Sequence, residues 1–206
     1  MSKIILIGYS GHAYVAHSIL TSVGKEVFAY CDSAIKENNP FNLEYLGNEN
    51  SEETLLTLSK NSFFIAIGDN QIRRRVYENL AAKSIFPINA IHSSAIICSS
   101  TIIGKSGVMI SAGVIINPLS KIGNGTICNT GCIIEHDCFI GDFAHIAPGA
   151  VLCGNVTIGA NSFIGAGSVI KQGITIGKNV VVGAGSVVIK DILDNATAYG
   201  NPAQLK

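Results

Sequence analysis

The feature that most constrains this chain is a six-residue repeat in its second part. From residue 122 onward, an apolar side chain returns at every sixth position without a break. The twelve positions are Ile122, Cys128, Ile134, Ile140, Ile146, Leu152, Ile158, Ile164, Ile170, Ile176, Val182 and Val188. An upstream block of Ile91, Ile97, Ile103, Met109 and Ile115 keeps the same step and is offset by one residue around Pro118–Lys121. A sustained hexapeptide period is typical of a parallel β-helix.

A longer period of three hexads fixes the geometry of this β-helix. An isoleucine followed by glycine returns after every third hexad, as Ile122-Gly123, Ile140-Gly141, Ile158-Gly159 and Ile176-Gly177. Three hexads therefore make one coil of a triangular prism, with each apolar anchor pointing toward the axis. Coils of this kind stack at the ~4.8 Å spacing of neighbouring strands. The seventeen hexads predict between five and six coils.

The first part of the chain has a different pattern, and composition shifts near residue 90. Apolar runs at 3–7, 27–31 and 62–67 each end at a glycine or an aspartate, and helical patterns cover 13–20 and 71–83. Strands that alternate with helices predict a small parallel sheet, which binds ligands at the carboxyl ends of its strands. We therefore expect an α/β Rossmann-like domain over residues 1–88 and a β-helix with a C-terminal tail over 89–206.

Composition excludes several classes of function. The chain has 206 residues, 14 Lys+Arg against 14 Asp+Glu, and only 14% charged residues. A nucleic-acid binder needs a basic surface, which this balance does not provide. No continuously apolar stretch is long enough to span a bilayer, so no membrane insertion is expected. The start, Met1-Ser2-Lys3 followed by four apolar residues, lacks the core of a secretion signal, which predicts a cytoplasmic protein.

The six cysteines do not predict a disulfide or metal framework. None of them forms a C-x2-C pair, and in a cytoplasmic chain cysteine is usually a small buried apolar residue. We therefore expect no bound metal ion.

Three sequence features together indicate which protein family this chain resembles. Gly-x-Ser-Gly-His follows the first strand at residues 8–12, Glu135-His136-Asp137 lies within the coils, and Gly200-Asn201-Pro202-Ala203 follows the last hexad. This combination resembles the hexapeptide-repeat sugar acetyltransferases that carry an N-terminal nucleotide-sugar domain. Their members are N-acetyltransferases of nucleotide-linked 4-amino-4,6-dideoxy sugars and sialic acid O-acetyltransferases. The resemblance implies a left-handed β-helix, acetyl-CoA as co-substrate and no metal.

His136 and Asp137 are the candidate catalytic residues. An amine or hydroxyl that attacks a thioester must lose a proton, and an imidazole with an ordinary pKa near ~6.5 can accept it at neutral pH. A neighbouring carboxylate stabilises the imidazolium that forms. The resemblance implies the same roles for both residues.

Four further residues of the coils are candidates for binding acetyl-CoA. Gly154 lies three hexads after His136, at the same corner of the next coil, where a backbone N–H could stabilise an oxyanion. His145 lies half a coil beyond His136 and points from a different side, so the two could meet only across a subunit boundary. The resemblance implies that His145 contacts acetyl-CoA and that Ala166 and Ala184 line its path.

The substrate candidates lie in the first domain. Gly8, Ser10, Gly11 and His12 form a turn between a strand and a helix, where backbone N–H groups could hold a phosphate. Asp32, at the end of the second strand, fits a contact to the ribose or base. Gly68, at the end of the third strand, is a further pocket residue. The basic side chains Arg73–Arg75 are interpreted as a solvated helix face.

The leading interpretation is an acetyl-CoA-dependent N-acetyltransferase acting on the 4-amino group of a nucleotide-linked sugar. An O-acetyltransferase acting on sialic acid or a related sugar acid is the alternative. A γ-carbonic anhydrase type of β-helix would need three histidine zinc ligands, which His136 and His145 do not supply. A purely structural β-helix would need regular threonine rows and no nucleotide domain. We expect a homotrimer, because the prism leaves sides rich in small apolar residues that a closed ring covers.

Overall fold

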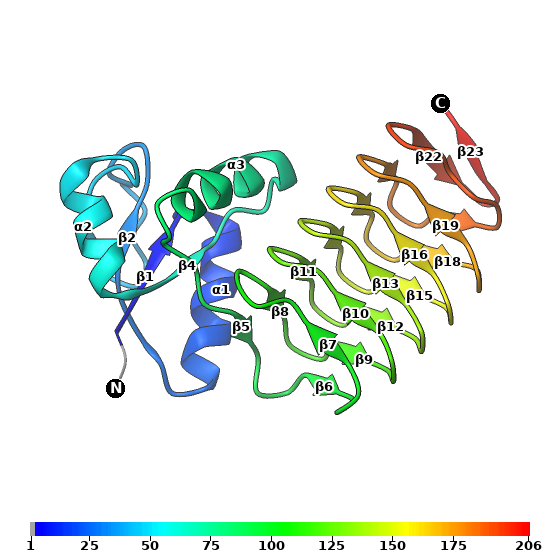
Figure 1. The fold of residues 1–206 in the computed structure, drawn as a ribbon, viewed down its shortest axis with the longest axis horizontal. Coiled ribbons are helices and arrows are strands. Elements are labelled where there is room, and N and C mark those ends of the chain that lie inside the picture. The colour runs from blue at the N-terminus through cyan, green and yellow to red at the C-terminus, as the bar shows by residue number, and fades with distance from the viewer. Residues whose placement is uncertain (1–2) are drawn as a thin grey trace.

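The computed structural model describes residues 3–206, and Figure 1 shows two parts joined end to end. A compact α/β unit holds the N-terminus, and a triangular prism extends away from it to the C-terminus. None of the helices within residues 3–206 is long and apolar enough to cross a membrane.

The α/β unit is built on a parallel four-stranded sheet in the order β3-β2-β1-β4. Its elements are β1 (Lys3–Ile7), α1 (Gly11–Ser22), β2 (Glu26–Cys31), β3 (Glu44–Tyr45), α2 (Glu52–Lys60), β4 (Ser62–Ile65) and α3 (Asn70–Ala81). Alternate residues of β1 point to opposite faces. Ile4 and Leu6 pack on the side of α1, whereas Ile5 and Ile7 pack on the side of α2 and α3. A sheet buried on both faces explains why β1 is a continuous apolar run.

Two details of this unit differ from the expectations. The apolar patterns do not predict the short β3 or the helix α2, although Ser51 followed by Glu52 and Glu53 is a usual helix start, and Ser51 Oγ accepts a bond from Thr54 N. Helix α3 is capped by Asp69, whose Oδ1 accepts a bond from Ile72 N at 2.8 Å. The helix begins at Asn70, one residue before the expected range of 71–83, and the side chain of Asn70 is free for another contact.

The prism has three sides, each a ladder of parallel two-residue strands. One side, which we call the docking face, is formed by β5 (Ala90–Ile91), β8 (Met109–Ile110), β11 (Ile127–Cys128), β14 (His145–Ile146), β17 (Phe163–Ile164) and β20 (Val181–Val182), and it ends in the hairpin β22 (Thr197–Gly200) and β23 (Ala203–Leu205). The second side, the aliphatic face, is formed by β6 (Ile96–Ile97), β9 (Ile115–Ile116), β12 (Ile133–Ile134), β15 (Val151–Leu152), β18 (Val169–Ile170) and β21 (Val187–Val188). The third face is formed by β7 (Ile102–Ile103), β10 (Lys121–Ile122), β13 (Phe139–Ile140), β16 (Thr157–Ile158) and β19 (Thr175–Ile176).

The hexad anchors point into the prism, as the sequence predicts. The second residue of each strand from β10 to β21 is almost fully buried in one continuous core. Strands one coil apart pair in the register of three hexads, as Ile122 with Ile140 and Ile140 with Ile158. The parallel β-helix expected from the repeat, left-handed as the resemblance implies, is thus the observed fold.

The upstream register is a correction to the expected repeat. The inward residues are Ile110 and Ile116, not Met109 and Ile115, and Ile91 pairs with Ile110, one residue beyond three hexads. The extra residue therefore lies between Ile103 and Ile110 rather than near residues 118–121. Met109 is buried for another reason, because it faces outward into the α/β unit.

The α/β unit sits on the first coils of the docking face. Ala90, Met109 and Ile127 share one hydrophobic core with helix α1 and strand β1. A single core that spans both parts fixes their relative orientation.

Candidate active site

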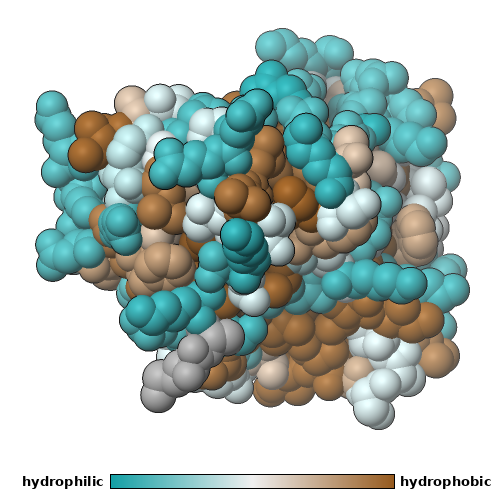
Figure 2. Space-filling model, turned by 60° about the vertical axis from the view of Figure 1, so that its left-hand side comes forward, coloured by the Kyte–Doolittle hydropathy of each residue, from teal (hydrophilic) through white to brown (hydrophobic). Residues whose placement is uncertain are grey.

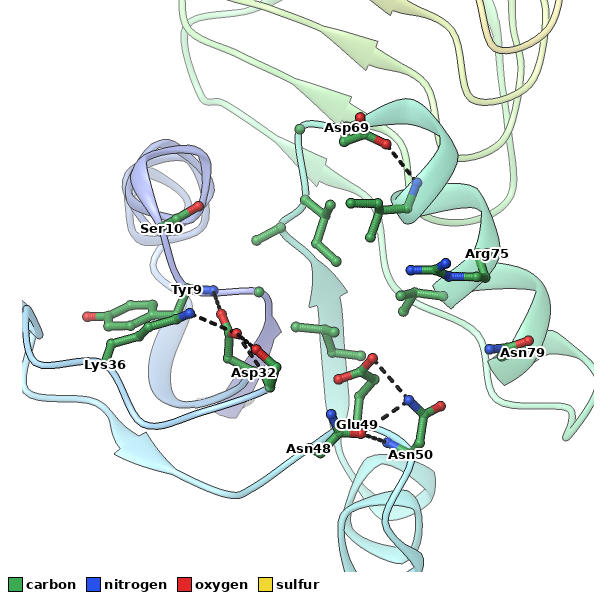
Figure 3. Close-up of a pocket in the computed structure, with 18 residues that line it drawn as sticks. Tyr9, Ser10, Asp32, Lys36, Asn48, Glu49, Asn50, Asp69, Arg75 and Asn79 are labelled. Carbon is green, nitrogen blue, oxygen red and sulfur yellow. Dashed lines mark hydrogen bonds and ion pairs between the residues drawn. The ribbon is translucent and has the colours of Figure 1, made fainter.

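The carboxyl edge of the small sheet carries a cavity of about 660 Å³ (Figure 3). Gly8, Ser10, Asp32 and Gly68 line it, as expected for ends of parallel strands. Gly11 and His12 do not line it, because they lie in the first turn of α1, behind Ser10. The cavity is large enough for a ligand of nucleotide size.

Gly8 allows the turn after β1 to pass close to the end of β4. Its φ is +87°, and a Cβ at this position would lie 2.7 Å from Cγ1 of Ile67 and 3.3 Å from the Ala66 carbonyl oxygen. Any other residue would be strained here and would also push the two loops apart.

Both carboxylate oxygens of Asp32 are already bound by other groups of the protein. Its Oδ2 accepts a bond from Tyr9 N at 2.9 Å, while its Oδ1 accepts from Ser33 N at 2.7 Å and pairs with Lys36 Nζ at 2.9 Å. Partial burial works to raise the pKa of this carboxyl, but the bonds from Lys36, Tyr9 and Ser33 outweigh it and hold the pKa below its ordinary value. Asp32 therefore shapes the rim of the cavity, and its proposed contact to the nucleotide stays a prediction.

The cavity also contains groups that sequence reasoning missed. Figure 3 shows Glu49 on the loop after β3 and Arg75 on α3, on different sides of the cavity. Asn48, Asn50 and Asn79 add amide groups to the same walls. The signal that could have found Glu49 is its position shortly after β3, at the same edge of the sheet as Asp32.

His12 and His145 meet at the junction between the two parts. Their ring centroids are 6.1 Å apart, and a Cβ on Gly68 would touch the His12 ring at 3.5 Å. Burial lowers the pKa of His12 to about 4 and that of His145 to about 3, and the positive charge of Arg73 adds to both shifts. Both imidazoles are therefore neutral at pH 7, and His145 lies beside the α/β unit of its own chain.

These shifts predict acid sensitivity of the fold. In the unfolded chain each histidine takes a proton near pH 6.5, but in the folded chain only near pH 4 or below, so stability is full above about pH 7 and is lost as pH falls. At pH 5 the loss is about 2 kcal/mol for each histidine. Thermal unfolding between pH 7.5 and 5 should show the midpoint falling, and the fall should be smaller in His12→Gln. His92→Gln, outside this junction, should keep the wild-type pH dependence; an equally steep fall in His12→Gln would contradict the assignment.

His136 and Asp137 form a hydrogen-bonded pair on the surface of the prism. They follow β12 at the corner between the aliphatic face and the third face, where Asp137 adopts a φ of +60°. His136 Nδ1 lies 2.9 Å from Asp137 Oδ2, and about half of each side chain is exposed. A carboxylate can only accept here, so Nδ1 carries the proton of this hydrogen bond and Nε2 is left as the nitrogen that can accept another proton.

Gly154 lies directly beneath the His136 ring. A Cβ at this position would lie 2.5 Å from Cε1 and 2.6 Å from Nε2 of His136. The absence of a side chain is what allows the imidazole to rest against the next coil. The oxyanion role of the Gly154 N–H stays a prediction.

This contact predicts the effect of Gly154→Ala. The added methyl group must push the imidazole away from its position beside Asp137, because the ring atoms lie closer than any van der Waals contact permits. If His136 is the base that the resemblance implies, we expect kcat to fall about tenfold, since a misplaced catalytic group is costly, and acetyl-CoA binding to be retained, since the backbone N–H of residue 154 stays in place. Steady-state kinetics with isothermal titration of CoA will test this; an unchanged kcat would show that the ring position does not matter.

Ala166 and Ala184 lie at another corner, between the docking face and the aliphatic face. They are exposed, and each precedes a glycine with positive φ. The glycines that turn this corner in successive coils are Gly113, Gly131, Gly149, Gly167 and Gly185. A Cβ on any of the last four would have no atom within 4 Å, so open space surrounds these glycines, and we call this edge the bare corner. This bare edge is a surface that a long, thin ligand can follow.

The two halves of the candidate site lie on different sides of one chain. The cavity lies in the α/β unit, which packs on the docking face where His145 also lies, whereas His136 lies at the corner opposite that face. Within residues 3–206, no cluster of three or more His, Cys, Asp or Glu side chains could hold a metal ion.

Comparison with known proteins finds a matching family for each of the two parts. Residues 3–80 match the PglD N-terminal domain family, residues 131–164 match the bacterial transferase hexapeptide family, and residues 155–190 match the hexapeptide repeat of succinyl-transferase. A crystal structure of a histidine-to-alanine variant of GDP-perosamine N-acetyltransferase from Caulobacter crescentus, in complex with CoA and GDP-perosamine, superposes with a TM-score of 0.93. It is 35% identical and covers 100% of this chain and 97% of that chain. The chain belongs to the hexapeptide-repeat sugar acetyltransferases with a PglD-type N-terminal domain.

Other members of the family are similar to the chain over different lengths. The acetyltransferase domain of PglB from Neisseria gonorrhoeae, in complex with acetyl coenzyme A, is 33% identical, with a TM-score of 0.89, and the match covers 99% of this chain and 98% of that chain. GDP-perosamine N-acetyltransferase of Escherichia coli O157:H7 is 39% identical over 89 residues, which is 43% of this chain and 40% of that relative. The matched segment thus spans less than half of this curated relative.

Proposed function

We propose that the protein is an N-acetyltransferase that transfers an acetyl group from acetyl-CoA to the amino group of a nucleotide-linked sugar. The observation that carries this proposal is the match over the whole chain to an enzyme that holds CoA and GDP-perosamine. The nucleotide-sized cavity at the sheet edge and the exposed His136–Asp137 pair give this chain matching parts. In this proposal each domain binds one substrate: residues 1–88 bind the nucleotide sugar, and residues 89–206 bind acetyl-CoA.

The chemistry follows from the tautomer of His136. Asp137 accepts a hydrogen bond from the Nδ1–H group of His136, so Nε2 can accept a proton from the attacking amine. The new bond joins the amine nitrogen to the acetyl carbonyl carbon, and the carbon–sulfur bond of the thioester breaks. The CoA sulfur leaves as a thiolate and takes the proton back from His136. Asp137 stabilises the imidazolium between these two steps.

The active enzyme in this proposal is a homotrimer. The outward residues of the aliphatic face are all β-branched aliphatic side chains, none of them fully buried: Ile96, Ile115, Ile133, Val151, Val169 and Val187. Figure 2 shows hydrophobic surface gathered on the lower part of the molecule. A three-fold ring that buries this face against neighbouring copies would remove the apolar column from water.

A ring of this kind also brings the two halves of the site together. His136 lies at one edge of the aliphatic face, and the bare corner with Ala166 and Ala184 lies at the other edge. Around a three-fold axis, one edge of each face meets the opposite edge of the next copy. His136 of one copy then approaches the docking face and the cavity of its neighbour, which a single chain does not allow.

Product analysis tests the function directly. The purified protein is incubated with acetyl-CoA and each of GDP-, UDP- and dTDP-linked 4-amino sugars, and with free sialic acid as the hydroxyl acceptor. Mass spectrometry should show one acetyl group added to one nucleotide-linked amino sugar. Acetylation of sialic acid alone would reject N-acetylation, and no acetylated product at all would reject the function. We place the reaction in the cytoplasm, where acetyl-CoA and nucleotide sugars are both available.

A further inference from the structure

Arg73 is a buried guanidinium without an acidic partner. It lies in α3, is 1% exposed, and takes part in none of the ion pairs of residues 3–206. Its donors are bound instead by four backbone carbonyl oxygens and one side-chain amide oxygen: Gly125 at 2.8 Å, Phe143 at 2.9 Å, Ile67 at 3.1 Å, Gly68 at 2.9 Å and Asn70 Oδ1 at 2.9 Å. The solvated helix face expected for Arg73–Arg75 is therefore wrong for Arg73, whereas Arg74 and Arg75 are exposed as expected, and Arg74 pairs with Glu78.

The carbonyl groups on the prism side come from successive coils. Gly125 and Phe143 lie one coil apart and turn the same corner, between the third face and the docking face. Asn70 extends the contact by one more coil, because its Nδ2 donates to Asn161 O at 3.0 Å and Ser162 O at 3.2 Å. Figure 1 shows the end of α3 beside these coils. One turn of helix thus holds three coils through Arg73 and Asn70.

The carbonyl groups on the other side belong to the wall of the cavity. Ile67 and Gly68 follow β4, and both line the 660 Å³ cavity. Gly68 and Asp69 also line a second cavity of about 290 Å³, whose opposite wall includes Phe163 and Val181 of the docking face. The segment from Gly68 to Asp69 therefore separates the nucleotide cavity from a space along the prism.

Stability alone does not account for this arrangement. Burial disfavours the charged guanidinium and lowers the pKa of Arg73 to about 9, although the nearby negative charge of Asp69 opposes this shift. A buried charge is often replaced by an apolar side chain without loss of stability. Five bonds in a fixed fork instead fix geometry, which an apolar side chain cannot do.

We propose that Arg73, assisted by Asn70, is a positioning residue that ties the Gly68–Asp69 wall of the cavity to the coils and thereby sets where the sugar of the substrate lies. The inference rests on the proposed function for its kinetic part. Neither side chain needs to touch the substrate, since both act through the wall.

The first test measures the wall without any substrate. Hydrogen–deuterium exchange is followed in peptides covering residues 66–70 of the full-length protein. Arg73→Lys keeps the charge but lacks the fork, and Asn70→Ala removes the contact to the third coil together with one of the five acceptors of Arg73. Both should speed exchange in these peptides at least fivefold, and Arg74→Lys, the matched control on the same helix, should not. Unchanged exchange in Arg73→Lys and Asn70→Ala would overturn the proposal, whether or not the protein is an acetyltransferase.

The second test separates positioning from a general loss of stability. Kinetics are measured well below the unfolding midpoint of each variant, with the nucleotide sugar that the wild type acetylates. KM for the sugar should rise about tenfold in Asn70→Ala and more in Arg73→Lys, while KM for acetyl-CoA stays within about twofold. An equal change in both KM values, or none in either, would overturn the positioning role. Should Arg73→Lys fail to fold, Asn70→Ala alone decides. A wild type without activity would reject the proposed function but leave the exchange test valid.

Discussion

Replacing His136 with alanine is expected to lower kcat by ~10²–10⁴-fold, the usual contribution of a general base. Binding of CoA should be retained, because the substitution leaves Ala166, Ala184 and the glycines of the bare corner unchanged. Steady-state kinetics give the first quantity and isothermal titration gives the second.

His92→Ala is the matched control for this prediction. His92 also lies in the coils, outside either half of the site, and its imidazole bonds to Ser94. Its removal should leave kcat within about twofold of the wild type. Near-normal kcat in His136→Ala would mean that the amine loses its proton elsewhere, and the pair with Asp137 would then be structural.

A charge on the aliphatic face should dissociate the protein and inactivate it. Val151 points outward from β15, one coil after Ile133, so Val151→Asp would bury a carboxylate without a partner in the proposed ring. We expect monomers in sedimentation velocity at micromolar concentration and a loss of activity of at least ~10²-fold, because His136 would no longer face a cavity.

Thr157→Asp controls for the added charge. Thr157 points outward from β16 on the third face, where the neighbouring coils carry Phe139 and Thr175. This variant should keep both the oligomer and the activity. A Val151→Asp protein that stays trimeric would move the interface to another face, and a fully active monomer would reject the shared site.

The fold could be predicted because its information is local and periodic. Each hexad has its own inward position, so a wrong assignment in one hexad does not alter the assignment of the others. The anchors from Ile122 to Val188 keep the predicted register. The upstream block failed at Met109 because an apolar residue can face the α/β unit as well as the prism axis. Periodicity shows that a residue is buried, but it does not show against what.

The candidate site was less predictable for the same reason. The spacing of three hexads correctly places Gly154 under His136, since the coil fixes that contact. The sequence could not show that Asp32 is saturated by Lys36, Tyr9 and Ser33, or that Arg73 is enclosed. Those facts depend on loops and on packing between the two parts, for which no short pattern exists.

The position of the base opposite the cavity has a consequence for newly made protein. In the proposed mechanism, a chain that has folded but not yet assembled carries His136 without a bound amine beside it, so it has no acceptor for the acetyl group. Activity should therefore begin only when copies meet, and it should fall on dilution more steeply than the protein concentration itself. In a mixed ring, one copy without the base would silence only the neighbouring cavity that it serves. The loss of this side chain from one copy would thus inactivate a single site and leave the other sites of the assembly active.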